Sequence, residues 1–179
     1  NVLQFASSGT AGLGYYRGAY FTPYQQAESL ISGPDVVVSA LIESAGKVLL
    51  VRQSEGYELP AQTMRGRSVD ETLTQVFSTL QIAASPGFIY SMWEDRQKKQ
   101  QHIVFLCAQP TGGTLPAVDQ GEWRDLQDLA AVPVANGALQ ALLGRYMREY
   151  AAGNYGLYYG DEAQGSVRQF SVPAHQEVV

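Results

Sequence analysis

The sequence has few of the residues that build metal clusters and covalent cross-links. It contains a single cysteine, Cys107, and two histidines, His102 and His175, which lie far apart in the chain. An intrachain disulfide needs two cysteines, and a structural zinc site needs about four cysteine or histidine ligands, so the sequence excludes both. Cys107 lies within the apolar run IVFLCA, which predicts a buried and unreactive thiol.

Basic residues are also scarce. The 179 residues include 12 lysines and arginines against 17 aspartates and glutamates, which gives a formal charge of −5. A protein that binds the phosphate backbone of nucleic acid presents a basic face, so we expect no nucleic-acid partner. The apolar fraction of 45% is enough to build a core, and the length predicts one domain with appendages.

The sequence shows no targeting or membrane-spanning pattern. It lacks a basic start followed by an apolar block, so we expect no signal peptide and a cytoplasmic location. It begins with Asn1 rather than methionine, and we expect it to be a piece of a longer protein. The uncharged stretch from Thr72 to Trp93 holds many hydroxyl and amide side chains and a Pro86-Gly87 break, so we expect no contact with a membrane.

Hydrophobic patterning predicts an α+β domain with an appendage at each end. Aliphatic and β-branched runs at 36–42 and 47–51 predict a hairpin, and the runs at 88–93 and 102–108 predict a second strand pair. A closing helix is predicted from about 137 to 150. The predicted organisation is an N-terminal arm, strand and short helix over 1–34, the domain over 35–152, and a C-terminal hairpin and tail over 153–179.

A further helix is predicted to begin at a capping box formed by Ser68 and Glu71. Its apolar stripe consists of Leu73, Val76, Phe77 and Leu80. Its other face is polar but uncharged and consists of Thr74, Gln75, Ser78 and Thr79. Solvated helix faces usually carry charges, so we predict that a second copy in a homodimer, or another domain of the same chain, covers this face.

The order of these elements resembles the Nudix (MutT-like) superfamily over roughly Asp35 to Tyr150. The resemblance is carried by VVVSALIES followed by AGKVLLVRQSEGYELP, which matches a strand, a glycine turn, a second strand and a Leu-Pro pair, and by the later GEWRDLQDL. It implies a Nudix-like α/β/α sandwich with a mixed β-sheet. Separately, YYRGAY at 15–20 resembles the final strand of flavin-reductase-like domains, which would place the chain in a fused flavoprotein.

The resemblance also implies a site, but the residues that define it differ here. The family's box carries clustered glutamates that hold divalent metal ions over a diphosphate, since Mg²⁺ requires oxygen ligands. Ala61 and Gln62 stand where the box has two glycines, Arg67 stands where its first glutamate belongs, and neutral residues such as Gln75 occupy the remaining acidic positions. We therefore expect a degenerate box with no metal site and no cofactor.

These departures predict a Nudix-like domain without the metal-binding glutamates, which serves a larger protein as a non-catalytic ligand-binding, regulatory or accessory module. In this hypothesis an anionic, nucleotide-like small molecule binds without metal to Gln62, Arg65, Arg67 and Gln75.

Two alternatives stay open. The chain could be an active Nudix hydrolase that cleaves a nucleoside-diphosphate-linked substrate, with Mg²⁺ held by acids outside the box such as Glu94 or Glu122. It could also be a structural module for dimerisation or domain docking. The sequence does not decide whether the chain is an enzyme, although it argues against a metal-dependent pyrophosphohydrolase.

Overall fold

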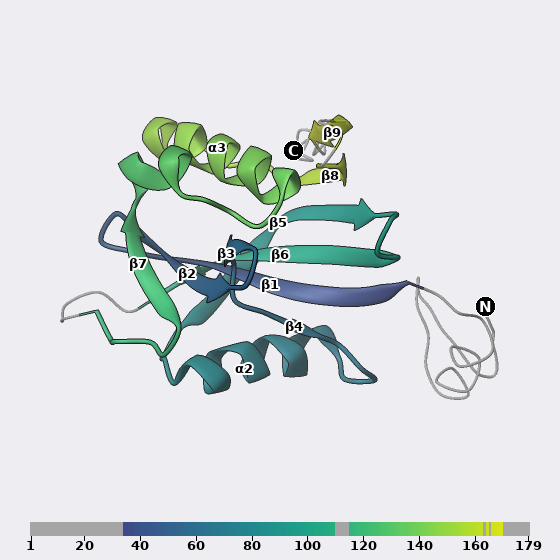
Figure 1. Cartoon of the computed structure of the whole chain (residues 1–179), viewed down its shortest axis with the longest axis horizontal. Coiled ribbons are helices and arrows are strands. Elements are labelled where there is room, and N and C mark those ends of the chain that lie inside the picture. The colour runs from purple at the N-terminus through teal and green to yellow at the C-terminus, as the bar shows by residue number, and fades with distance from the viewer. Residues whose placement is uncertain (1–33, 110–114, 163, 165, 170–179) are drawn as a thin grey trace, which may run out of the picture. The chain divides into compact units, whose positions relative to one another are not determined.

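The computed structural model describes residues 34–109, 115–162, 164 and 166–169, which form a nine-stranded sheet between two helical layers (Figure 1). The arm, strand and short helix expected over 1–34 therefore lie outside the described residues, apart from Pro34. The strands are β1 (Asp35–Ser44), β2 (Lys47–Gln53), β3 (Gly56–Glu58), β4 (Ala61–Thr63), β5 (Ser85–Asp95), β6 (Gln100–Ala108), β7 (Gly121–Asp125), β8 (Tyr158–Asp161) and β9 (Ser166–Gln169). The helices are α2 (Val69–Leu80), the 3₁₀ helix η1 (Leu126–Ala131) and α3 (Gly137–Ala152).

Strand β1 lies at the centre of the sheet because it pairs along both of its edges. One edge runs parallel to β6 from Asp35 to Glu43. Along the other edge, the first half of β1 pairs with β4 and its end pairs with β2, both in the antiparallel sense. The strand order along the sheet is β3-β2-β1-β6-β5-β8-β9, and β7 pairs with β2 outside this order. The predicted mixed sheet and α+β layering are confirmed.

The first predicted hairpin is confirmed and closes through a two-residue turn. Ser44 pairs with Lys47, and the residues between them, Ala45 and Gly46, have φ angles of 53° and 76°. Positive φ at both central positions is the type I′ geometry that fits the right-handed twist of a hairpin. The Glu43 carboxylate strengthens the turn by accepting a hydrogen bond from the Gly46 N–H at 2.9 Å.

Both long helices begin and end with specific caps. The Ser68 hydroxyl accepts a hydrogen bond from the Glu71 N–H at 3.1 Å, so the predicted start of α2 is confirmed. Asn136 caps α3 in the same way by accepting from the Leu139 N–H at 2.9 Å. Helix α3 ends at Gly153, whose φ of 69° is the left-handed conformation favoured at helix C-termini.

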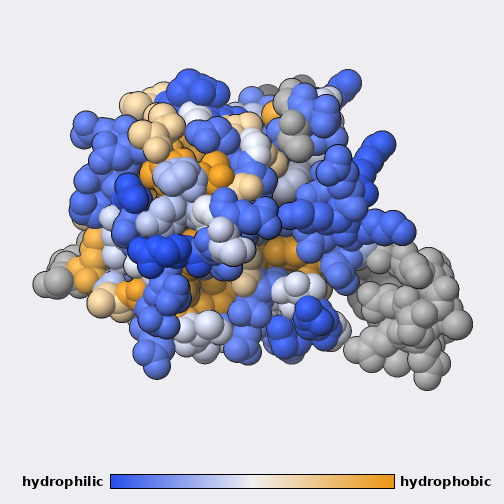
Figure 2. Space-filling model, viewed as in Figure 1, coloured by the Kyte–Doolittle hydropathy of each residue, from blue (hydrophilic) through white to orange (hydrophobic). Residues whose placement is uncertain are grey.

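The two helical layers cover separate hydrophobic clusters on the two faces of the sheet. The cluster under α2 contains Leu73 and Val76, which are buried, while Phe77 and Leu80 from the same predicted stripe are only partly buried. The larger cluster under α3 and η1 has Tyr90, Leu129 and Leu142 at its centre. Figure 2 shows that the face toward the viewer is mostly hydrophilic, with hydrophobic residues confined to small areas.

The uncharged face of α2 is open to solvent in the described part of the chain, because Thr74, Gln75, Ser78 and Thr79 are all exposed. The cover expected from a second copy or another domain therefore stays a prediction. The predicted C-terminal hairpin is formed by β8 and β9, and β8 joins the sheet by running parallel to β5. Among the described residues, no helix is both long and apolar enough to cross a bilayer.

Candidate functional site

A cavity of about 500 Å³ lies where the ends of β5 and β6 meet the β8–β9 hairpin. Small-molecule sites commonly have volumes of about 300–1,000 Å³, so the cavity is large enough for a cofactor ring system. Strand β5 contributes Met92, Trp93 and Glu94 to the lining. The remaining lining residues are Arg96, Gln101, His102, Ile103, Tyr159, Gly160, Asp161 and Ser166.

Trp93 and His102 form an aromatic wall of this cavity. They are register partners on the antiparallel strands β5 and β6, which brings their side chains together on one face of the sheet. Their rings are stacked with centroids 4.0 Å apart and planes inclined by 7°. The same two residues also line a second, smaller pocket of about 60 Å³ beside Ser39 and Leu139. Trp93 and His102 therefore line both pockets.

The aromatic wall carries no charge at neutral pH. Burial of the imidazole disfavours its charged form and lowers the pKa of His102 to about 4; Lys98 acts in the same direction, and Asp95 opposes the shift. A neutral imidazole stacked on an indole offers π surface and ring nitrogens to a ligand. The wall is suited to a planar aromatic ring.

The charged side chains of the cavity are mainly acidic. Glu94, a candidate from the sequence, lines the cavity and forms an ion pair with Arg96, in which Nε lies 3.6 Å from Oε1. Arg96 is 86% exposed along its side chain, so solvent screens that pair strongly. Asp161 lines the cavity from β8 and accepts a hydrogen bond from the Gln164 N–H at 3.1 Å. An anionic group would therefore meet two carboxylates and a single solvated guanidinium.

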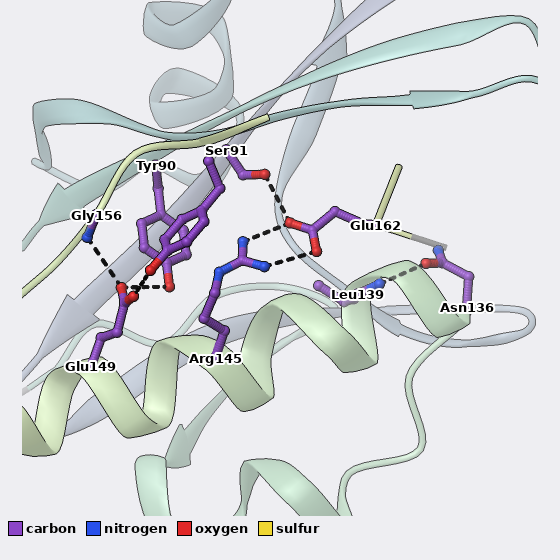
Figure 3. Close-up of polar contacts among 9 residues, drawn as sticks. Tyr90, Ser91, Asn136, Leu139, Arg145, Glu149, Gly156 and Glu162 are labelled. Carbon is purple, nitrogen blue, oxygen red and sulfur yellow. Dashed lines mark hydrogen bonds and ion pairs between the residues drawn. The ribbon is translucent and has the colours of Figure 1, made fainter. Parts of the chain in front are cut away.

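A buried ion pair anchors the β8 side of the cavity (Figure 3). Glu162 directly follows Asp161, and its carboxylate accepts hydrogen bonds from Arg145 Nη1 at 2.9 Å and Nη2 at 2.6 Å. The Ser91 hydroxyl donates a third at 2.8 Å. The side chains of Arg145 and Glu162 are only 11% and 1% exposed. Bidentate geometry of this kind fixes orientation as well as distance, so it ties β8 to α3 and β5.

Aromatic rings complete the surroundings of the buried guanidinium. Burial lowers the pKa of Arg145, but the hydrogen bonds and charge of Glu162 more than offset that effect, so the net pKa is raised. The guanidinium carbon lies 4.0 Å from the ring centroid of Tyr158 and 5.2 Å from that of Tyr90. Both tyrosine hydroxyls donate to the Glu149 carboxylate, the Tyr90 hydroxyl at 3.0 Å. This network is shown in Figure 3.

Glu122, the other acidic candidate from the sequence, lies on β7 and is not part of the cavity lining. Its carboxylate contacts the guanidinium groups of Arg124 and Arg52 and accepts a hydrogen bond from the Tyr57 hydroxyl at 3.2 Å. The hydrogen bond from Arg124 is the main reason why the pKa of Glu122 is lowered. Glu122 is thus an ionised carboxylate that is paired with Arg52 and Arg124 and hydrogen-bonded to Tyr57.

The four residues predicted to bind an anion lie apart from the cavity lining. Gln62 is on β4, and Arg67 donates from Nη2 to the Thr63 carbonyl at 3.2 Å. Arg65 is exposed with a φ of 46°, and Gln75 is exposed on α2, where its amide contacts the Thr79 hydroxyl at 3.5 Å. Their proposed role in binding stays a prediction.

Two simpler expectations can be compared with the described residues. Cys107 is 5% exposed, and burial raises the pKa of its thiol to about 12, in agreement with a buried and unreactive cysteine. Across the described ranges, no three histidine, cysteine, aspartate or glutamate side chains lie close enough to hold a metal ion together. The expectation of no metal site remains a prediction for the whole chain.

Comparison with solved structures shows that the chain has a Nudix-like fold. A Nudix hydrolase from Nitrosomonas europaea superposes with a TM-score of 0.63 at 18% identity, over 72% of this chain and 78% of that chain. A protein from Sinorhizobium meliloti 1021, provisionally described as an oxidoreductase, superposes with a TM-score of 0.58 at 30% identity, over 79% of this chain and 49% of that chain. No family model matches the sequence.

Two curated relatives are similar over nearly the whole chain. The reductase component of a flavin-dependent trigonelline monooxygenase from Acinetobacter baylyi is 41% identical over 169 residues, which are 94% of this chain and 53% of that protein. A Rhizobium meliloti protein named "Probable flavin reductase" is 32% identical over 93% of this chain and 53% of that protein. The chain thus spans about half the length of the curated relatives it matches.

These relatives correct two expectations from the sequence. The predicted function, a non-catalytic binding or accessory module with a hydrolase or a docking module as alternatives, is wrong, because the relatives that match nearly the whole chain are named as the reductase component of a flavin-dependent monooxygenase and as a probable flavin reductase. The expectation that no cofactor is involved is wrong for the same reason. The error has a physical origin: the absence of box acids on one helix concerns metal-dependent hydrolysis only, whereas hydride chemistry is supplied by organic cofactors.

Proposed function

We propose that this chain is part of a flavin reductase that supplies reduced flavin to a separate monooxygenase component. The observation that carries the proposal is the 41% identity over 94% of the chain with the reductase component from Acinetobacter baylyi. Since the chain spans about half of that relative, the proposed activity belongs to the whole protein that contains it. Its substrates would be an oxidised flavin and a reduced pyridine nucleotide, because flavin reduction requires a hydride donor.

The geometry of the cavity supports a role in handling these substrates. Flavins and pyridine nucleotides both carry planar aromatic rings, and the cavity of about 500 Å³ has an aromatic wall made by Trp93 and His102. Because His102 is neutral, the wall does not repel a cationic or electron-poor ring. The proposed partner is a monooxygenase component that accepts the reduced flavin.

We also propose that the Nudix box is degenerate and that flavin reduction needs no divalent metal at α2. The acids of α2 are Asp70 and Glu71 in its first turn, where the Glu71 N–H donates to the capping hydroxyl of Ser68. Acids at this position stabilise the start of a helix through its dipole. Treatment with EDTA should therefore leave the rate of flavin reduction unchanged.

The test is a steady-state assay on the intact protein that contains this chain. We expect oxidation of NADH or NADPH to depend on added FMN, FAD or riboflavin, and the reduced flavin to support turnover when a cognate monooxygenase is added. A reaction without flavin is the control for direct oxidation by oxygen. Failure to oxidise either nucleotide with all three flavins would contradict the proposal.

A further inference from the structure

We propose that the cavity between β5, β6 and β8 binds a planar, electron-poor nitrogen heterocycle against the aromatic wall of Trp93 and His102. Flavins and oxidised nicotinamides both contain rings of this class. This inference deepens the proposed function and rests on it. It assigns the ring-binding site to the Nudix-fold part of the protein, at Trp93 and His102, for which the sequence predicted no binding role.

The shape and chemistry of the wall favour a flat ring. The two rings are already stacked, with centroids 4.0 Å apart and planes inclined by 7°, so they form one preorganised aromatic unit in the lining. Their strands are hydrogen-bonded neighbours, which limits movement of one ring relative to the other. Preorganisation lowers the entropy that a ligand must lose to bind. Polar groups for the edge of the ring are available at Gln101 and Ser166.

The charges around the cavity favour the ring over a phosphate group. Glu94 and Asp161 are carboxylates, and the one cation among the lining residues, Arg96, is 86% exposed and already paired with Glu94. Two carboxylates within a few ångströms of a bound anion repel it and so raise its free energy. A ligand that carries a phosphate should therefore gain nothing from it here, so riboflavin should bind at least as tightly as FMN.

The buried network keeps the β8 side of the cavity in place. Asp161 contributes to the lining, and the next residue, Glu162, is held by Arg145 and Ser91 through three hydrogen bonds of 2.6 to 2.9 Å. The position of Asp161 is thus fixed by the contact of its neighbour Glu162 with Arg145 of α3. These contacts fix the position of this part of the lining relative to β5 and α3.

The decisive measurement is the dissociation constant of riboflavin, obtained by calorimetry with the 179-residue chain and two tryptophan variants. We expect Trp93→Leu to weaken binding at least tenfold and Trp93→Phe to retain most of it, since phenylalanine keeps an aromatic face. Trp123→Phe is the matched control, because the only other tryptophan packs in the cluster under α2 and donates to the Pro116 carbonyl. It should bind like the unmodified chain.

Two further probes identify the ring and test the charge argument. N-methylnicotinamide replaces riboflavin in the same titrations, and Trp93-dependent binding of either compound supports the inference while showing which ring is preferred. FMN should bind no more tightly than riboflavin, and Asp161→Asn should improve FMN binding more than riboflavin binding. Circular dichroism of each variant establishes that it is folded.

The outcomes separate this inference from the proposed function. If neither compound binds, or if both bind equally well to folded Trp93→Leu, the ring site is overturned even when the intact protein still reduces flavin. If Trp93-dependent binding is found but the intact protein does not reduce flavin, the proposed function fails and the binding site stands. Much tighter binding of FMN than of riboflavin would overturn the charge argument.

Discussion

The two faces of the sheet are stabilised in different ways, although one helical layer covers each of them. The buried hydrophobic side chains under α2 are aliphatic apart from Cys107, and the buried Thr72 hydroxyl of α2 donates to the backbone carbonyl of Ser68 at 2.7 Å. Under α3, the aliphatic core is joined by buried tyrosines and by the ion pair between Arg145 and Glu162. Within the described residues, these two are the buried charged side chains.

This difference shows where the polar chemistry of the domain lies. The Nudix resemblance directs attention to the helix over 69–80, where the family carries its metal ligands. In this chain the buried ion pair lies on the face under α3. The aromatic wall and the cavity lie on the same face or on the strands next to it. A familiar fold can thus carry its polar groups on the face opposite to the expected one.

The largest effect that would sharpen this comparison is expected from Arg145→Met. This change leaves the Glu162 carboxylate buried without its cation, which should lower the free energy of unfolding by about 3–5 kcal/mol. The double variant Arg145→Met/Glu162→Leu should recover most of that loss, because an apolar pair has no charge to desolvate. Urea unfolding monitored by circular dichroism measures both. A single-variant loss below about 1 kcal/mol would show that the ion pair does not hold β8.

The α2 face should respond to lost packing and not to lost charge. Leu73→Ala removes a side chain that is 3% exposed, and we expect a loss of about 2–4 kcal/mol in the free energy of unfolding. Phe77→Ala should cost less, about 1–2 kcal/mol, even though phenylalanine is larger, because Phe77 is only partly buried. Chemical denaturation gives the ranking. A larger loss for Phe77→Ala would mean that the helix is rotated about its axis.

The stability of the chain should also depend on the protonation of His102. The pKa of His102 is lowered to about 4 in the folded chain, so the unfolded chain binds a proton first as the pH falls. The free energy of unfolding should therefore decrease between about pH 6.5 and pH 4, by about 1–2 kcal/mol for a partly solvated ring. His102→Phe keeps the aromatic stack and removes the titration, so its stability should change less over this range. Equal pH dependence of both proteins would contradict the assignment.

The smallest effect on stability is expected on the uncharged face of α2. Ser78→Lys adds a charge to an exposed position and should change the free energy of unfolding by less than about 0.5 kcal/mol. If a second copy covers this face, as the sequence predicts, the same substitution should shift the sedimentation coefficient from that of a dimer to that of a monomer. A monomer before and after the change would remove the predicted homodimer.

Much of the fold could be predicted from the sequence because its signals are local. The capping box at Ser68 and Glu71 and the Ala45-Gly46 turn depend on neighbouring residues, and both are confirmed. The aromatic wall depends on strand register: Trp93 meets His102 because each lies two residues from the Asp95–Gln100 pair at the β5–β6 turn, and the bulges lie farther along, between Pro86 and Ser91. The predicted strand runs end at 93 and begin at 102, so the sequence brings both residues near one turn, but it does not show that their rings stack.

The same limit applies to the buried ion pair. Arg145 lies within the predicted final helix, and Glu162 lies in the predicted turn between two strands of the C-terminal hairpin, where acids are usually solvated. Their pairing requires β8 to add to the sheet beside β5, which is a long-range contact. A periodicity argument cannot reveal a contact between elements whose relative placement is unknown.

The parallel pairing of β1 with β6 also has a consequence for how the chain folds. These strands pair from Asp35 to Glu43 of β1, yet β2, β3, β4, α2 and β5 all lie between them in the chain. The β1–β2 and β5–β6 hairpins can each form locally. The β1–β6 pairing at the centre of the sheet requires the closure of a long loop, which costs conformational entropy before the stabilising contacts form. We therefore expect docking of the two hairpins to limit the refolding rate, and stopped-flow refolding should be slower than for a helical protein of equal length.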